Sequence, residues 1–226
     1  MVPLVGIMGE AGIVLVVLGG WAVALLALSR SRGDEDVSWE LRGRPRQPIG
    51  AFVEEAEGCI LGRVSQLTRL LRSPMTGRDC VAYTFCVYRH GGARVGWKKV
   101  LDLAEHVPFA VDDTTGRAVA AAGRPCLWLR VDRWDQSDSL CPAGGRVREI
   151  LRQHGFSSVG ASLRYEEGIL VEGEMVTVLG VGRRRDVADL ADVDSQQRYR
   201  ERARCLVMSE RADGYLVISN EPSALA

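Results

Sequence analysis

The chain has 226 residues, of which 46% are hydrophobic and 26% are charged, as in an ordinary folded protein. Its 29 lysines and arginines balance its 29 aspartates and glutamates, so the formal net charge is zero. Nucleic-acid binding needs an excess of positive charge against the phosphates, so this balance argues against a nucleic-acid partner. The length suits one membrane anchor and one domain.

The first predicted element is a membrane-spanning helix from Ala11 to Ser29, a segment with no charge and no proline. At about 1.5 Å per residue, such a helix would be about 28 Å long, close to the hydrocarbon thickness of a bilayer. A cleaved signal peptide is the main alternative, but it would need a positive charge among residues 1–10, which contain no lysine or arginine. We therefore expect a single-pass anchor over residues 11–29, preceded by a short tail.

The arginines near this helix all lie on its C-terminal side: Arg30, Arg32, Arg42, Arg44 and Arg46. By the positive-inside rule, the N-terminal tail is non-cytoplasmic and the rest of the chain is cytoplasmic. Arginine greatly outnumbers lysine, a bias typical of GC-rich genomes, so we expect the membrane to be a bacterial inner membrane. Residues 30–50 predict a charged linker, and residues 51–226 predict one soluble domain.

The elements expected after residue 50 are mainly strands. Two helices are expected: Phe52 to Leu71, where Gly58 and Gly62 could admit a strand, and Gly145 to His154. The predicted strands are Cys80 to Tyr88, Val95 to Leu103, a strand and its return from Phe109 to Ala122, Arg124 to Asp132, Leu163 to Val171, Met175 to Val181, and a final hairpin of Cys205–Ser209 and Tyr215–Ser219. We therefore expect an α+β fold that is mainly β, with antiparallel strands, partly barrel-like, one or two helices and the N-terminal transmembrane helix.

Six cysteines are present: Cys59, Cys80, Cys86, Cys126, Cys141 and Cys205. An even number permits disulfides, but most lie in apolar runs of a chain large enough to form a core, which favours buried thiols. Cys80 and Cys86 are expected on one face of one strand, about 20 Å apart, too far to share a metal ion. No C-x-x-C pair occurs and the histidines, His90, His106 and His154, are scattered, so no metal ligands are predicted.

No catalytic or cofactor-binding residue is predicted either. Gly180-Val-Gly182 begins like a dinucleotide-binding loop, but Arg185 stands where the third glycine belongs, which favours the end of a strand. Cys141 precedes a predicted helix and is the one cysteine placed for reactivity at a helix N-terminus, the nucleophile that an enzyme hypothesis would need. Arginines in residues 183–204 are interleaved with acidic residues, which favours a solvated mixed-charge surface over a lipid-binding one.

Four segments of the predicted domain occur in a recognisable order: Gly62-Arg-Val with Leu70 to Cys80, Val81 to Val87, Pro108 to Gly116, and Tyr165 to Gly180. Together they resemble the GIDE ("beside a membrane") domain of membrane-anchored E3 ubiquitin ligases and their bacterial relatives, over roughly residues 57–220. The resemblance implies a β-rich domain that lies next to a membrane and recognises other proteins. In the eukaryotic ligases a second span and a RING finger follow, and the zinc ligands of a RING finger are absent from this sequence.

We therefore expect a membrane-tethered, non-catalytic module that binds an unidentified protein partner without a cofactor or metal. Two alternatives stay open. One is an E3 ubiquitin ligase-like transferase, by family association, and the other is a membrane-surface protein that senses lipid or envelope stress. The charged stretch 183–204 and the turn at residues 73–78 are the candidate binding surfaces.

Overall fold

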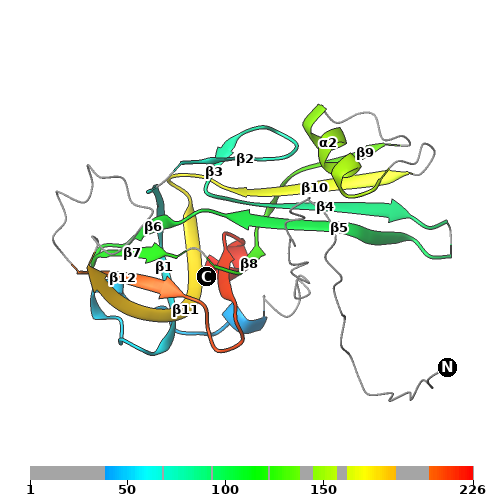
Figure 1. Cartoon of the computed structure of the whole chain (residues 1–226). Coiled ribbons are helices and arrows are strands. Elements are labelled where there is room, and N and C mark those ends of the chain that lie inside the picture. Colours follow the sequence, from blue (N-terminus) through cyan, green and yellow to red (C-terminus); the bar gives the residue numbers. More distant parts are fainter. Residues whose placement is uncertain are drawn as a thin grey trace, which may run out of the picture.

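A computed structural model describes residues 39–67, 69–92, 94–121, 123–137, 145–156, 162–186 and 204–225. They form two β-sheet units, a barrel and a longer sheet that extends from it (Figure 1). The expected mainly-β fold with few helices is confirmed. The predicted span over residues 11–29 lies outside the described residues. Within the described residues, no helix combines the length and apolar character needed to cross a membrane.

The barrel is closed by five strands: β1 (Glu57–Gln66), β6 (Phe109–Asp112), β7 (Arg117–Ala120), β12 (Arg204–Ser209) and β11 (Met175–Asp186). They pair in that order, and β11 returns to β1 to close the ring. The β7–β12 pair is parallel and the other pairs are antiparallel. Numbered along the chain, the barrel order is 1-2-3-5-4-1 with a parallel 3–5 pair, which is the Greek-key strand order of the OB-fold.

Two glycines allow the barrel strands to approach closely. A Cβ atom on Gly62 of β1 would lie 2.5 Å from the carbonyl oxygen of Asp112, and one on Gly180 of β11 would lie 2.5 Å from that of Ser209. Both distances are far inside van der Waals contact, so a side chain at either position would push the strands apart. The predicted helix from Phe52 to Leu71 is therefore wrong. Its two glycines lie in strand β1, which pairs with β6 and β11, two strands far away in the sequence.

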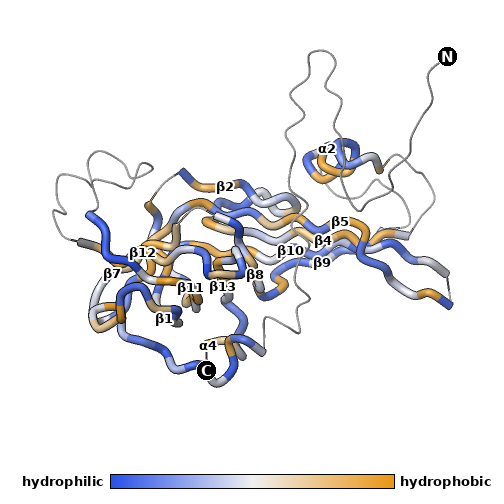
Figure 2. The backbone as a smooth tube through the Cα atoms, turned by 60° about the horizontal axis from the view of Figure 1, so that its bottom comes forward, coloured by the Kyte–Doolittle hydropathy of each residue, from blue (hydrophilic) through white to orange (hydrophobic). Residues whose placement is uncertain are grey.

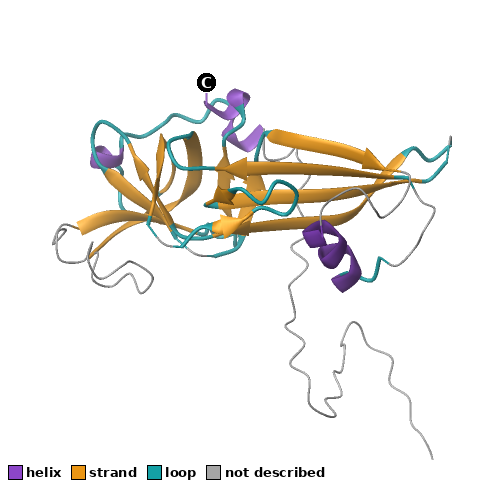
Figure 3. Ribbon diagram, turned by 90° about the horizontal axis from the view of Figure 1, so that it is seen from above, coloured by secondary structure: helices purple, strands orange, loops and turns teal. Residues whose placement is uncertain are grey.

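The second unit is a four-stranded antiparallel sheet in the order β5 (Trp97–His106), β4 (Ala82–His90), β10 (Leu163–Leu170) and β9 (Val131–Ser137). Its strands come from two connections of the barrel, one between β1 and β6 and one between β7 and β11. Helix α2 (Gly145–Gln153) covers one face of this sheet, as Figure 3 shows. The barrel thus holds the sheet at one end (Figure 1), and residues of β8 lie beside the face opposite α2.

The remaining elements given bounds in the described residues are short. They are the 3-10 turn η1 (Ile49–Ala51), the pair β2 (Leu71–Arg72) and β3 (Asp79–Cys80), strand β8 (Pro125–Trp128), strand β13 (Leu216–Ser219) and helix α4 (Pro222–Leu225). β13 runs antiparallel to β11, as β12 does, so β12 and β13 point in the same direction. The predicted final hairpin is therefore wrong. The tight turn exists, with Gly214 at φ +81°, but it returns the chain to β11 instead of to β12.

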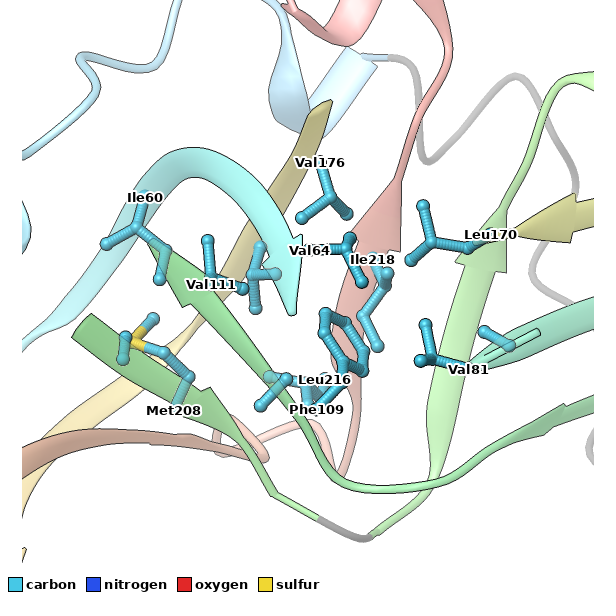
Figure 4. Close-up of a cluster of buried hydrophobic side chains, with 14 of the residues drawn as sticks. Ile60, Val64, Val81, Phe109, Val111, Leu170, Val176, Met208, Leu216 and Ile218 are labelled. Atoms are coloured by element: carbon cyan, nitrogen blue, oxygen red, sulfur yellow. The ribbon is translucent and has the colours of Figure 1, made fainter. Parts of the chain in front are cut away.

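Two hydrophobic cores stabilise the units. The barrel core contains Ile60, Val64, Phe109, Met208 and Ile218, and Figure 4 shows them converging from different strands. The sheet core lies under α2, a helix that mixes hydrophobic and hydrophilic residues along its length (Figure 2). Its buried residues, Val147 and Leu151, are one helical turn apart and pack against the sheet. The predicted helix from Gly145 is confirmed.

Residues 39–50, within the segment predicted as a linker, pack on the barrel. Leu41 and Ile49 are buried. Arg46 donates to the carbonyl oxygen of Ala224 at 2.6 Å, and the largely buried Arg211 pairs with Glu40 at 2.8 Å. The described part of the folded unit thus includes residue 39, and at most residues 30–38 lie between it and the predicted span.

Candidate functional site

A pocket of about 150 Å³ lies where the four-stranded sheet meets strand β8. It opens on the face of the sheet opposite α2. Alternate residues of a strand point to opposite faces, so Thr84, Cys86 and Tyr88 of β4 face the pocket while Tyr83 and Phe85 face the helix. The complete lining is Thr84, Cys86, Tyr88, Lys99, Asp102, Ala104, Pro125, Cys126, Leu127, Trp128, Leu129, Val131, Glu166, Gly168, Tyr215 and Glu221.

The polar wall of the pocket is built from two hydrogen-bonded groups. On β5, Asp102 pairs with Lys99 at 3.2 Å and accepts a hydrogen bond from the thiol of Cys86 at 3.4 Å. On β10, Glu166 pairs with Arg164 at 3.0 Å. Cys86 of β4 pairs in register with Asp102 of β5 on one side and with Glu166 of β10 on the other. The two carboxylates therefore lie in one row across the three strands. Their side chains keep about a fifth of their surface exposed, so a ligand can reach them.

Aromatic rings form much of the rest of the pocket wall. Tyr88 comes from the sheet, Trp128 from β8 and Tyr215 from the turn before β13. The guanidinium of Arg164 lies over the Tyr88 ring at 4.6 Å and over the ring of Trp97, on β5, at 5.6 Å. The pocket therefore combines carboxylates with flat aromatic surfaces.

One buried side chain holds β8 against the sheet. Asn220 accepts a hydrogen bond at 2.8 Å from the backbone N–H of Arg130, just after β8, and donates one at 3.2 Å to the carbonyl oxygen of Ile169 on β10. Ser219 donates to the carbonyl oxygen of Trp128 at 2.6 Å. These contacts join segments that are far apart in sequence, so the width of the pocket is set by tertiary structure.

The pocket continues into an exposed part of the same sheet face. Trp134 of β9 lies opposite Glu166 in the register, hence on the same face, and its side chain is 64% exposed. His90 and Trp97, at the far end of the sheet, stack edge to face at 5.1 Å. We call Trp134, Tyr88, Trp97, Arg164 and Lys99 the open sheet face. A large exposed aromatic side chain such as Trp134, with half-buried aromatic rings near it, is typical of protein-binding surfaces.

The turn at residues 73–78, one of the predicted binding surfaces, is fixed from inside. The fully buried Glu167 of β10 accepts hydrogen bonds from the backbone N–H of Met75 at 2.5 Å and from the hydroxyl of Thr76 at 2.7 Å. Thr76 also contacts the hydroxyl of Ser73 at 2.8 Å. Segments that the GIDE resemblance quotes separately thus meet here, and their polar residues hold the turn on the sheet.

Another segment of the GIDE resemblance, Pro108 to Gly116, forms strand β6 and the turn of the β6–β7 hairpin. Its turn is closed by Asp113, whose carboxylate accepts hydrogen bonds from the backbone N–H groups of Thr115 at 2.6 Å, Gly116 at 2.8 Å and Ile49 at 2.9 Å. Burial raises the pKa of Asp113, but these hydrogen bonds outweigh it, and the pKa lies below its ordinary value. This aspartate joins the barrel to the N-terminal segment.

The structure brings few of the remaining sequence candidates together. Cys141 lies outside the described residues, as do residues 187–203 of the charged stretch. Arg183 continues β11 and pairs with Glu55 at 2.9 Å. Gly180 and Gly182 lie within β11, packed against other strands and Phe52. No group of three or more metal-ligating side chains occurs among the residues that the structure describes.

The cysteines differ from the sequence prediction in one respect. Cys80 belongs to the core under α2, whereas Cys86 faces the pocket on the other side of the sheet. The expectation that both share one face of one strand is wrong, because Val81 interrupts the strand and turns its side chain into the barrel core. All five described cysteines are free thiols.

Sequence reasoning missed the pocket. The signal that could have indicated it is the alternation in β4 of large apolar residues with Thr84, Cys86 and Tyr88, a pattern typical of a strand with one face partly in solvent. Comparisons add no assignment: no family model, no curated protein and no solved structure matches the chain. The GIDE resemblance therefore stays a prediction.

Proposed function

We propose that this chain is a membrane-tethered protein-interaction module whose partner binds the open sheet face and the pocket beside it. The observation that carries the proposal is the pocket itself, a recess lined by carboxylates and aromatic rings at the edge of an exposed aromatic surface. The barrel supports the sheet at one end, and α2 packs on the face opposite the pocket. A rigid sheet with one accessible face can bind a partner without rearranging.

The tether rests on the sequence. The apolar segment 11–29 has the length and composition of a spanning helix. The described part of the fold includes residue 39, so at most residues 30–38 separate the two, a distance of at most about 30 Å when fully extended. A domain on so short a connection stays beside the bilayer. That position agrees with the GIDE resemblance.

Site-specific photo-cross-linking of the full-length protein in its own membranes tests the binding face. A photoreactive amino acid at Trp134 reports on the open sheet face, and one at Val53, 62% exposed but outside the pocket lining, is the matched control. We expect a discrete cross-linked protein from position 134 that position 53 does not give. The same bands from both positions, or none from position 134, would overturn the proposed binding face.

The tether has its own test. Membranes washed with carbonate and with high salt should retain the full-length protein, because a spanning helix is not extracted by either treatment. A variant that starts at residue 30 should be released. Release of the full-length protein would contradict the tether, whatever the cross-linking shows.

A further inference from the structure

We infer that the pocket binds the side chain of a single arginine supplied by the partner protein. This inference rests on the proposed function and names the chemistry that the pocket recognises. The size of the pocket is the first argument. At about 150 Å³ it is smaller than the 300–1,000 Å³ typical of small-molecule sites, and it matches one amino-acid side chain.

Charge is the second argument. Three carboxylates line the pocket: Asp102, Glu166 and Glu221. Lys99 already pairs with Asp102, and Arg164, whose guanidinium lies over the lining residue Tyr88, pairs with Glu166. Glu221 makes hydrogen bonds through its backbone. Its carboxylate forms no ion pair with any other residue that the structure describes. A cationic group entering the pocket therefore meets the uncompensated negative charge of Glu221.

The aromatic walls select arginine over lysine. A guanidinium is planar, stacks on aromatic rings and can contact a carboxylate through two N–H groups, whereas an ammonium acts as a point charge. The sheet already holds one guanidinium in this way: Arg164 lies over Tyr88 at 4.6 Å and pairs with Glu166 at 3.0 Å. A second guanidinium in the pocket would find Trp128 and Tyr215 as walls and Glu221 as its partner.

The test uses the full-length protein in nanodiscs, labelled with 5-fluorotryptophan, and the capped peptide Gly-Arg-Gly as the probe. The signal of Trp128, identified with Trp128→Phe, reports on the pocket wall. We expect it to shift and saturate at millimolar peptide, while the isosteric citrulline peptide has no effect. A response to citrulline equal to that to arginine, or no response to either, would overturn the inference, as would lysine binding as tightly as arginine.

Substitutions assign the carboxylate. Glu221→Gln keeps the size of the side chain and should weaken arginine binding about three- to tenfold, the loss of one charge-assisted hydrogen bond. Glu54→Gln removes the same charge outside the pocket and should leave the binding unchanged. Equal affinities in the two variants would contradict the role of Glu221. Ala104→Phe, which fills the pocket, gives an independent check and should abolish the Trp128 shift.

Failure of this inference and failure of the proposed function are distinguishable. If position 134 cross-links a partner but the arginine peptide leaves Trp128 unmoved, the pocket assignment is wrong and the interaction surface stands. If the peptide binds at Trp128 but no partner cross-links, the arginine pocket stands and the proposed protein-binding role is wrong.

Discussion

The buried carboxylate of Glu167, on β10, accepts a hydrogen bond of 2.5 Å from the backbone N–H of Met75, in a turn 92 residues earlier in the chain. The same carboxylate binds the hydroxyl of Thr76 at 2.7 Å. Pro74 of this turn is buried and Met75 packs against the core under α2, so the polar contacts of Glu167 add to a hydrophobic contact in holding the turn. Glu167 therefore acts as the internal cap of the 73–78 turn.

Replacing Glu167 should destabilise the protein strongly. Glu167→Ala leaves buried donors without an acceptor and should lower the free energy of unfolding by about 2–4 kcal/mol. Glu167→Gln keeps one acceptor oxygen and should cost less. Urea unfolding of the detergent-solubilised protein measures both, with Glu54→Gln, at an exposed carboxylate 3.5 Å from Arg184, as the control. A loss below about 0.5 kcal/mol in Glu167→Ala would show that the turn is held by something else.

The packing of α2 on the sheet can be tested at Leu151, which is almost fully buried. Leu151→Ala removes three carbon atoms from this core and should lower the free energy of unfolding by about 2–4 kcal/mol. Arg148→Ala, on the exposed side of the same helix, should change it by less than about 0.5 kcal/mol. Equal effects of the two substitutions would mean that the helix is not docked through this face.

The carboxylate of Asp113 should make stability depend on pH in the acid range. Burial raises the pKa of this carboxyl. The hydrogen bonds from Ile49, Thr115 and Gly116 lower it by more than burial raises it, so the folded-state pKa lies below the unfolded value. The stabilisation is then complete above the unfolded pKa of about 3.9 and is lost as pH falls through the folded-state pKa. Denaturant unfolding between pH 6 and pH 2.5 should show a shallower acid dependence in Asp113→Asn. An unchanged slope would contradict the assignment.

The free thiols should differ in reactivity according to the sheet face they occupy. Burial, reinforced by the charge of Glu167, raises the pKa of Cys80 to about 12, so its thiolate is scarce at neutral pH. Cys86 is half-exposed and faces the pocket. Maleimide labelling of the native protein, read by mass spectrometry, should modify Cys86 well before Cys80. Faster labelling of Cys80 would show that the core under α2 opens.

Local patterns in the sequence are enough to predict several elements. The spacing of Val147 and Leu151 before Gly155 indicates α2, and the turn sequence around Asp113 indicates the β6–β7 hairpin. Both depend on contacts within about ten residues. For such elements the local signal and the tertiary structure agree.

The partition of strands between barrel and sheet depends on long-range pairing that no local pattern carries. β10 and β11 are separated by a four-residue turn region, residues 171–174, yet they join different sheets. Similarly, the predicted strand from Arg124 to Asp132 divides at Leu129 into β8 and β9, which pair with β13 and β10. The pocket forms between these strands and depends on Asn220, more than 80 residues from β8. The alternation in β4 can indicate a sheet face partly in solvent, but the place of the pocket on that face could not be predicted from the sequence.

The most direct test of the proposed binding face is the yield of the partner cross-linked from position 134 when the pocket is filled. Ala104→Phe occupies the recess without changing charge, and Val95→Phe, on the exposed tip between β4 and β5, is the matched control. If the partner binds the open sheet face through the pocket, Ala104→Phe should reduce the cross-linked product at least severalfold, while Val95→Phe leaves it unchanged. An undiminished product in Ala104→Phe would contradict the pocket's role in binding.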